Sequence, residues 1–203
     1  TVILIVFFID ESYVPEQVAD QKVFQHICQM LRNYREVFRD HLFIMYCMAI
    51  VFVMSLEFQL SNYVGIRLES EMPVQRFLWW ELDGIEMTGL LRTENTVLVV
   101  LMALFAAKMV SRFKDRHVII LGSFVFVAGY AYISYSNYIP FLFIAMLLAS
   151  VAEVVRVPVE QNYQASLPPV HARSSYLAVS GMGYNLAQLI CSITVMISAY
   201  LNN

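Results

Sequence analysis

The chain has 203 residues, of which 59% are hydrophobic and only 14% are charged. A soluble domain has roughly 45–50% apolar and about 25% charged residues, so this chain carries too little charge to cover a soluble globule of its size. The composition predicts an all-α polytopic membrane protein. The net charge of −3 excludes the basic surface that a nucleic-acid partner requires.

The first nine residues form an apolar run that Asp10 and Glu11 end. A membrane-spanning helix needs about 20 residues, and a signal peptide would need a basic start and a small-residue cleavage site. We therefore interpret residues 1–9 as the tail of a transmembrane helix whose beginning is missing. On this interpretation the chain is a fragment of a longer protein.

Residues 10–41 connect this tail to the next apolar run. Apolar residues recur at steps of three and four from Val23 to Phe38, and polar residues occupy much of the opposite face. This pattern predicts an amphipathic helix that lies along the membrane surface or against the protein. Both a simple connector and a regulatory helix remain open.

Residues 42–203 contain five further apolar runs, each of which predicts a full membrane span. The runs are continuous, whereas strands of a membrane barrel would alternate in short segments, so we expect helices. The second run is short, and we expect its helix to include residues 89–95. The predicted spans are 41 or 42 to about 66, 96–110, 118–135, 139 to about 155 or 164, and 176–201.

Lys and Arg are unevenly distributed among the segments between these spans. Ten of the thirteen lie in residues 10–41, 108–117 and 156–175, and the other three lie in residues 67–95. Because Lys and Arg concentrate on the cytoplasmic side, we expect the first three segments to be cytoplasmic and 67–95 to face outward.

Two carboxylates within the spans are candidates for proton coupling, since an ionisable residue in a membrane helix is costly to keep. Glu57 lies in the outer half of the first span, where a solvated vestibule is the alternative. Glu153 shares one helix face with Ser150, Glu160 and Gln164, and Arg156 is one turn away and positioned to pair with it. The alternative is that the helix leaves the membrane near Glu153.

Polar side chains near these carboxylates and in the last span are candidates for substrate binding. Gln59, Asn62 and Tyr63 follow Glu57 in a stretch too polar to face lipid. In the last span, Asn185 and Gln188 form a polar stripe with Gly181 and Ser192. The stripe either lines a water-filled cavity or joins neighbouring helices.

No pattern in the chain indicates metal, cofactor or enzyme chemistry. The three cysteines have no metal-ligand spacing, and neither a phosphate-binding loop nor a Ser-centred nucleophile motif is present. We expect no metal, no cofactor and no enzymatic activity.

Several stretches, taken in order, resemble the C-terminal half of a major facilitator superfamily transporter of the bacterial drug:proton antiporter branch. The resemblance implies twelve helices in two halves, with residues 1–9 as the end of helix 6 and the five spans as helices 7 to 11. The N-terminal half and the last helix are then missing partners from the same protein. The stretches are 33–40 (NYREVFRD), 57–63 (EFQLSNY), 89–95 (GLLRTEN), 153–161 (EVVRVPVEQ) and 172–176 (ARSSY).

The resemblance also implies a conformational motif in the cytoplasmic loop between helices 8 and 9. Of its pattern, Gly-x3-Asp-Arg-x-Gly-Arg-Arg, only Arg112 and Arg116 match here. The family reading predicts a multi-pass plasma-membrane protein that exports amphipathic, cationic small molecules in exchange for protons by alternating access. A proton-coupled importer and a truncated, non-transporting membrane fragment are the alternatives.

Overall fold

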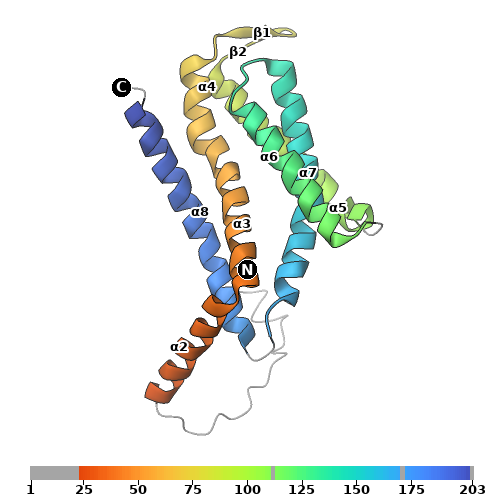
Figure 1. Ribbon diagram of the computed structural model, residues 1–203. Helices are drawn as coiled ribbons and strands as arrows, with labels where there is room; N and C mark the ends of the chain where they lie inside the picture. The colour runs from red at the N-terminus through yellow and green to blue at the C-terminus, as the bar shows by residue number, and fades with distance from the viewer. Residues whose placement is uncertain (1–22, 111–112, 170–171, 202–203) are drawn as a thin grey trace, which may run out of the picture.

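The computed structural model describes residues 23–110, 113–169 and 172–201, and it is almost entirely helical (Figure 1). The predicted helix tail at residues 1–9 lies outside the described residues. The elements are α2 (Val23–Arg39), α3 (His41–Gln59), a π-helix η1 (Leu60–Val64), α4 (Gly65–Glu71), β1 (Gln75–Phe77), β2 (Trp80–Leu82), α5 (Gly84–Val110), α6 (Asp115–Ile133), α7 (Ile139–Ser166) and α8 (Arg173–Leu201).

Five helical stretches in the described part of the chain are long and apolar enough to cross a membrane. This confirms the prediction of an all-α polytopic protein with five spans. The candidate spans are His41–Glu71, Gly84–Ala106, Asp115–Ile133, Ile139–Ser166 and Arg173–Ser198.

The second span begins at Gly84, earlier than the start at residue 89 that the sequence predicts. The start is stabilised by a reciprocal pair of hydrogen bonds. The Glu86 backbone N–H donates to the Asp83 carboxylate at 2.8 Å, and the Asp83 backbone N–H donates to Glu86 Oε2 at 3.2 Å. Such a capping box satisfies N–H groups that a helix start leaves without partners. Residues 84–95 are therefore helical although they are polar.

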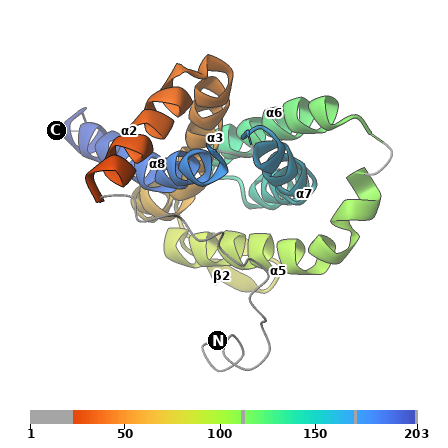
Figure 2. The same cartoon turned by 90° about the horizontal axis from the view of Figure 1, so that it is seen from below.

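The helices pack as two groups. α7 packs along both α6 and α5, whereas α3 packs along α8. Viewed from below, α2, α3 and α8 gather on one side and α6 and α7 on the other, and α5 runs past both groups (Figure 2). Contacts of α4 with α5 and of α3 with α6 join the groups.

Two glycines on α6 allow it to approach α7 closely, as small residues do in membrane helix pairs. A Cβ at Gly129 would lie 3.0 Å from both the Ala145 backbone oxygen and the Ala149 Cβ. A Cβ at Gly122 would lie 3.1 Å from the Arg156 Cβ. Both glycines therefore serve the packing of α6 against α7.

Polar contacts connect the helices at both ends of the bundle. At one end the buried Arg67 side chain donates to the Asn137 side chain at 2.8 Å and to backbone oxygens after α6, including that of Ser136 at 2.8 Å. At the other end Asp40 accepts from the Phe43 backbone N–H at 3.0 Å and from the Tyr176 hydroxyl at 3.1 Å. The α6–α7 turn and the start of α8 are thereby tied to the helices around α3.

Candidate functional site

The most polar stretch inside the bundle lies on α7, where Ser150, Glu153, Arg156 and Glu160 succeed one another at steps of three, three and four. Ser150, Arg156 and Glu160 are buried, with exposed fractions of 0%, 4% and 8%. Steps of three and four keep these side chains on one helix face. Two buried charges within an apolar span need specific partners, because an isolated charge there is strongly disfavoured.

Glu153 is held by α5. The Asn95 side-chain amide donates to Glu153 Oε2 at 3.0 Å and to the Ser150 hydroxyl at 3.1 Å. A carboxylate that accepts such a bond has part of its lost hydration replaced. Asn95 lies within the candidate span Gly84–Ala106, in the stretch 89–95 that the sequence analysis expects this helix to include. The sequence placed Asn95 in this helix, but it did not reveal the partners of its amide on α7.

Arg156 does not pair with Glu153, which corrects the expectation from the sequence. Its guanidinium instead forms a buried ion pair with Glu160, one turn further along α7. The Arg156 side chain also lies over the Phe126 ring of α6, with 5.0 Å between the guanidinium carbon and the ring centroid. The hydrogen bond from Asn95 holds Glu153 on the side of α5. Arg156 lies on the side of α6, where it contacts Phe126 and packs beside Gly122.

The ion pair is also connected to α3. The Tyr46 hydroxyl donates to the Glu160 backbone oxygen at 2.8 Å. The backbone of Glu160 therefore contacts α3, while its partner Arg156 contacts α6.

Glu57 extends from α3 toward the same polar region. It lies close enough to Glu153 and to Arg156 for their charges to act on it, and the Tyr130 side chain on α6 is within reach of all three charges. The Glu57 side chain is exposed in this chain. The charges of the two predicted coupling carboxylates therefore influence one another, and their coupling role remains a prediction.

Gln59 and Asn62 make their contacts with α8. The Gln59 amide donates to the Thr194 hydroxyl at 2.5 Å, and the Asn62 amide donates to Cys191 Sγ at 3.4 Å and to the Phe58 backbone oxygen at 2.9 Å. Tyr63 is half-buried and packs against the main apolar core. The π-helix η1, which the sequence did not reveal, contains Asn62 and Tyr63 and changes the helical period after Gln59.

Asn185 and Gln188 are exposed on α8. Within the part of the chain that the structure describes, neither amide bonds to another helix; the one nearby bond runs from the Ser192 hydroxyl to the Gln188 backbone oxygen at 2.9 Å. The amides of the stripe therefore do not join α8 to the helices in the described part of this chain. Its role in substrate binding remains a prediction.

A pocket of about 330 Å³ lies between α3, α7 and α8, one turn from Asn185. Polar side chains from α7 and the start of the α8 stripe meet there. It is lined by Ile50, Met54, Gln161, Gln164, Ala165, Leu177, Ser180, Gly181 and Tyr184.

The structure does not test whether the two arginines of the loop motif act together. Arg112 lies outside the described residues, and Arg116 is exposed in the first turn of α6.

A further carboxylate, Glu94 on α5, was not among the predicted site residues. Its Oε2 is buried and has no hydrogen-bond partner among the described residues. Glu94 lies in the stretch 89–95 that the sequence analysis expects in this helix, but the sequence did not single it out.

Comparison with known proteins identifies the family. A sequence profile described as the Major Facilitator Superfamily matches residues 81–201, which is more than half of the chain. The chain belongs to this superfamily. Members of the superfamily are transporters and not enzymes, which confirms the expectation that this chain is not an enzyme.

A curated relative carries a more specific name. The chain is 21% identical over 175 residues to a protein of Planococcus maritimus named a Na⁺, Li⁺, K⁺/H⁺ antiporter. The match covers 84% of this chain and 41% of the relative. The chain thus spans about two fifths of the length of this relative.

Proposed function

We propose that this chain is part of a proton-coupled secondary transporter of the plasma membrane, and that it forms most of the C-terminal half of that protein. Glu153 is the main protonation site and Glu57 the second. The observation that carries this proposal is the position of Glu153. Its carboxylate accepts a hydrogen bond from Asn95 within the spanning helices. The charges of Glu153 and Arg156 also act on Glu57.

In this proposal, coupling arises from the charge of that region. A proton bound at Glu153 removes one negative charge from the space near Glu57 and Arg156, and its release restores the charge. A rearrangement that opens the region to each side of the membrane in turn binds and releases protons at the two sides, and substrate affinity changes with the state. The buried ion pair with Glu160 fixes the Arg156 guanidinium beside the site, while the pair as a whole carries no net charge.

The proposed substrate is a cation moved outward in exchange for protons. The acidic side chains at Glu57 and Glu153 attract cations, and the exposed amides of Asn185 and Gln188 offer polar contacts to an amphipathic molecule. Gln59, Asn62 and Tyr63 are assigned a supporting place in the same cavity. Substrates of this kind agree with the drug:proton antiporter branch that the sequence resembles.

A second candidate is exchange of inorganic monovalent cations for protons. The name of the Planococcus maritimus relative favours it, and the oxygen atoms of Glu153 and Ser150 lie near one another through their shared bond to Asn95. Hard monovalent cations prefer such oxygen ligands. Proton-coupled import and a non-transporting fragment are the remaining alternatives.

The test is transport by the full-length protein in proteoliposomes with an imposed pH gradient. Internal pH is recorded while Na⁺, K⁺, Li⁺ or an amphipathic organic cation is added outside. Glu153→Gln keeps the size and hydrogen-bonding capacity of the side chain but cannot ionise, and we expect it to abolish gradient-driven exchange. Glu69→Gln, an exposed position on α4, is the matched control and should transport normally.

Each alternative gives a different result in this assay. Proton movement with inorganic cations alone selects the second candidate, and uptake along the proton gradient selects an importer. Normal pH-driven transport by Glu153→Gln would remove Glu153 from the mechanism.

A further inference from the structure

A short hairpin covers the start of α5. Strands β1 and β2 pair antiparallel with Phe77 opposite Trp80, and the turn between them holds Leu78 at a φ of 58°. A positive φ is unfavourable for a bulky residue, so the surrounding contacts must maintain this turn. The Phe77 ring packs against Phe143 of α7 with 5.6 Å between centroids, and the Gln75 amide donates to the Asn137 backbone oxygen at 2.8 Å.

This fixed hairpin presents two tryptophans that the rest of the described chain leaves uncovered. Trp79 is 72% exposed and Trp80 is 58% exposed, and their ring centroids are 6.0 Å apart. Exposed indoles are common at a membrane interface, where lipid alone would account for them. A pocket lies beneath the rings, and contact with lipid does not explain it.

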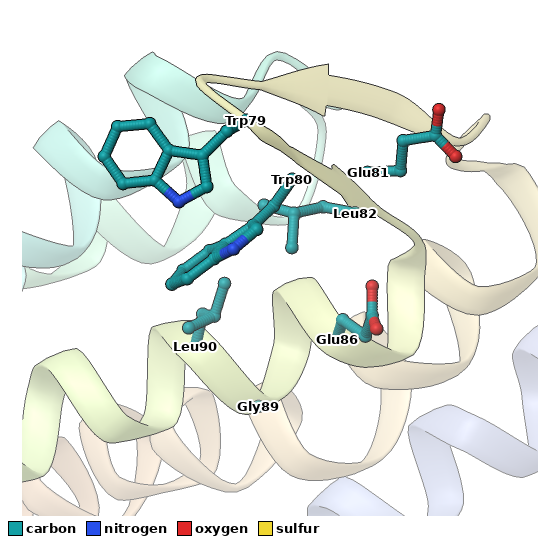
Figure 3. Close-up of a pocket in the computed structure, with 7 residues that line it drawn as sticks. All are labelled: Trp79, Trp80, Glu81, Leu82, Glu86, Gly89 and Leu90. Atoms are coloured by element: carbon teal, nitrogen blue, oxygen red, sulfur yellow. The ribbon is translucent and has the colours of Figure 1, made fainter.

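The pocket lies between the hairpin and α5 and has a volume of about 700 Å³. In Figure 3 the Trp80 indole extends over Leu90, and Glu86, one turn earlier on α5, points toward the hairpin. Gly89 forms part of the floor, and a Cβ placed there would meet nothing within 4 Å. The lining residues are Trp79, Trp80, Glu81, Leu82, Glu86, Gly89 and Leu90.

The chemistry of this pocket suits a cation. An indole face attracts a positive charge, and ammonium groups are the ligands that aromatic cages recognise. The lining contains two carboxylates and no Lys or Arg. Glu86 Oε2 accepts a bond from the Asp83 backbone, which orients this carboxylate beside the pocket. Glu81 contributes less, because Figure 3 shows its side chain pointing away from Trp80.

We propose that the Trp80–Glu86 pocket binds the ammonium group of an organic cation at the end of the bundle that the sequence predicts to face outward. The cation is either a free molecule or the headgroup of a choline or ethanolamine lipid, since both present the same charge and size to the pocket. This binding is separate from the proton coupling assigned to Glu153 and does not require transport.

The first experiment measures choline binding to the purified full-length protein in maltoside detergent by isothermal titration calorimetry. The neutral isostere 3,3-dimethylbutan-1-ol serves as the probe without charge. We expect choline to bind and the alcohol not to bind. Trp80→Ala removes the ring and Gly89→Leu fills the floor, and each should weaken choline binding by about tenfold or more.

Tyr135→Ala is the matched control, because Tyr135 is an 88% exposed aromatic residue at the same end of the bundle and lies outside the pocket. It should bind choline like the wild type. Melting temperatures establish that the variants are folded, and Gly89→Leu tests the same site from the opposite wall if Trp80→Ala unfolds. Equal binding of choline and the alcohol, no binding by the wild type, or unchanged binding in folded Trp80→Ala and Gly89→Leu would each overturn the proposal.

The second experiment separates the two sources of the cation. Choline binding is repeated in nanodiscs of phosphatidylglycerol alone and of phosphatidylglycerol with phosphatidylcholine. Weaker apparent binding in the mixed nanodiscs identifies a lipid headgroup as the occupant, and equal binding identifies a free cation. In the Glu153→Gln background, Trp80→Ala should weaken choline binding by the same factor as in the wild type, so failure of the coupling proposal and failure of this one are distinguishable.

Discussion

Arg156 and Glu160 place two opposite charges in the part of α7 that packs against α3 and α6, with exposed fractions of 4% and 8%. A buried ion pair contributes little net stability, because desolvation offsets most of the attraction, whereas removing one partner leaves a charge that nothing compensates. The pair has a second support in Phe126, whose ring faces the guanidinium. The pair therefore avoids a loss of folding stability only while both charges are present.

Glu160→Gln is predicted to destabilise the protein by about 3–5 kcal/mol, because Arg156 then stays buried without its counter-charge. Thermal unfolding of the full-length protein in detergent measures the loss as a lower melting temperature. The double variant Arg156→Leu/Glu160→Leu removes both charges and should recover most of the stability. A double variant as unstable as the single one would show that the pair has a role beyond charge compensation.

At the residue scale the sequence identified the charges better than their partners. Glu57, Glu153 and Arg156 stand out because charged residues are rare inside apolar runs. The partner of Arg156 did not follow from spacing, since positions three before and four after it are both within one helical turn. Only the packing of Asn95 and Phe126 on either side of α7 decides between Glu153 and Glu160, and contacts between distant segments are not visible in a local pattern.

Among the helices, α5 depends most on a single small residue. Gly84 begins α5 where that helix crosses α4, and a Cβ at Gly84 would lie 1.9 Å from the Leu68 backbone oxygen. A backbone atom cannot rotate away as a side chain can, so any larger residue forces the two helices apart. The hairpin and the Asp83–Glu86 capping box depend on the same crossing.

Gly84→Ala is therefore predicted to lower stability by about 1–3 kcal/mol or more, the usual range for overpacking a tight contact. Gly89→Ala is the control on the same helix, because a Cβ there meets nothing within 4 Å. Alanine has the higher helix propensity, so Gly89→Ala should be neutral or slightly stabilising. Melting temperatures of the two variants test this; equal melting temperatures would contradict the close crossing of α4 and α5.

The hydropathy of the sequence predicted that five spanning helices exist. It did not predict where each helix begins and ends, or where a helix is irregular. Five apolar runs predicted five spans because lipid requires helices with internally satisfied backbones. The polar start of α5 concealed its true length, since hydropathy does not detect a capped polar turn. The π-helix Leu60–Val64 and the hairpin 75–82 depend on packing against α8 and α7, which a single segment does not encode.

Over the whole molecule, two of the stretches that resemble transporters meet in space. Residues 33–40 end at Asp40 and residues 172–176 end at Tyr176, and these two side chains share a hydrogen bond of 3.1 Å. The buried side chains Val37, Phe43, Ala172 and Tyr176 form a small apolar core at the same place. The start of α3 and the start of α8 thus belong to one end of the bundle, as the distribution of Lys and Arg requires.

The orientation of the bundle can be tested with one native and one introduced cysteine. Cys28 is exposed on α2, and Ser70 is exposed at the end of α4. In a full-length protein without other cysteines, an impermeant maleimide added to intact cells should label Ser70→Cys and not Cys28. Inverted vesicles should give the opposite result. Labelling of Cys28 in intact cells would reverse the predicted topology.

The polar stripe on α8 is exposed in the described part of this chain. Asn185 and Gln188 are exposed, and an amide facing lipid would lose its hydrogen bonds to water. The pocket at Gly181 continues along the same face toward α7. A water-filled cavity shared with other parts of the transporter accounts for both observations, whereas packing within this chain does not.

The double variant Asn185→Ala/Gln188→Ala is predicted to change the substrate profile of the full-length transporter while its melting temperature changes little. If the amides instead pair with a helix outside this chain, each lost bond costs about 0.6 kcal/mol and at most about 1.7 kcal/mol, and stability falls while the profile is unchanged. Resistance profiles in cells and thermal unfolding in detergent measure the two effects separately. Ile197→Ala, on another face of α8, is the control and should leave the profile unchanged. A destabilised double variant with the wild-type profile would remove Asn185 and Gln188 from the substrate site.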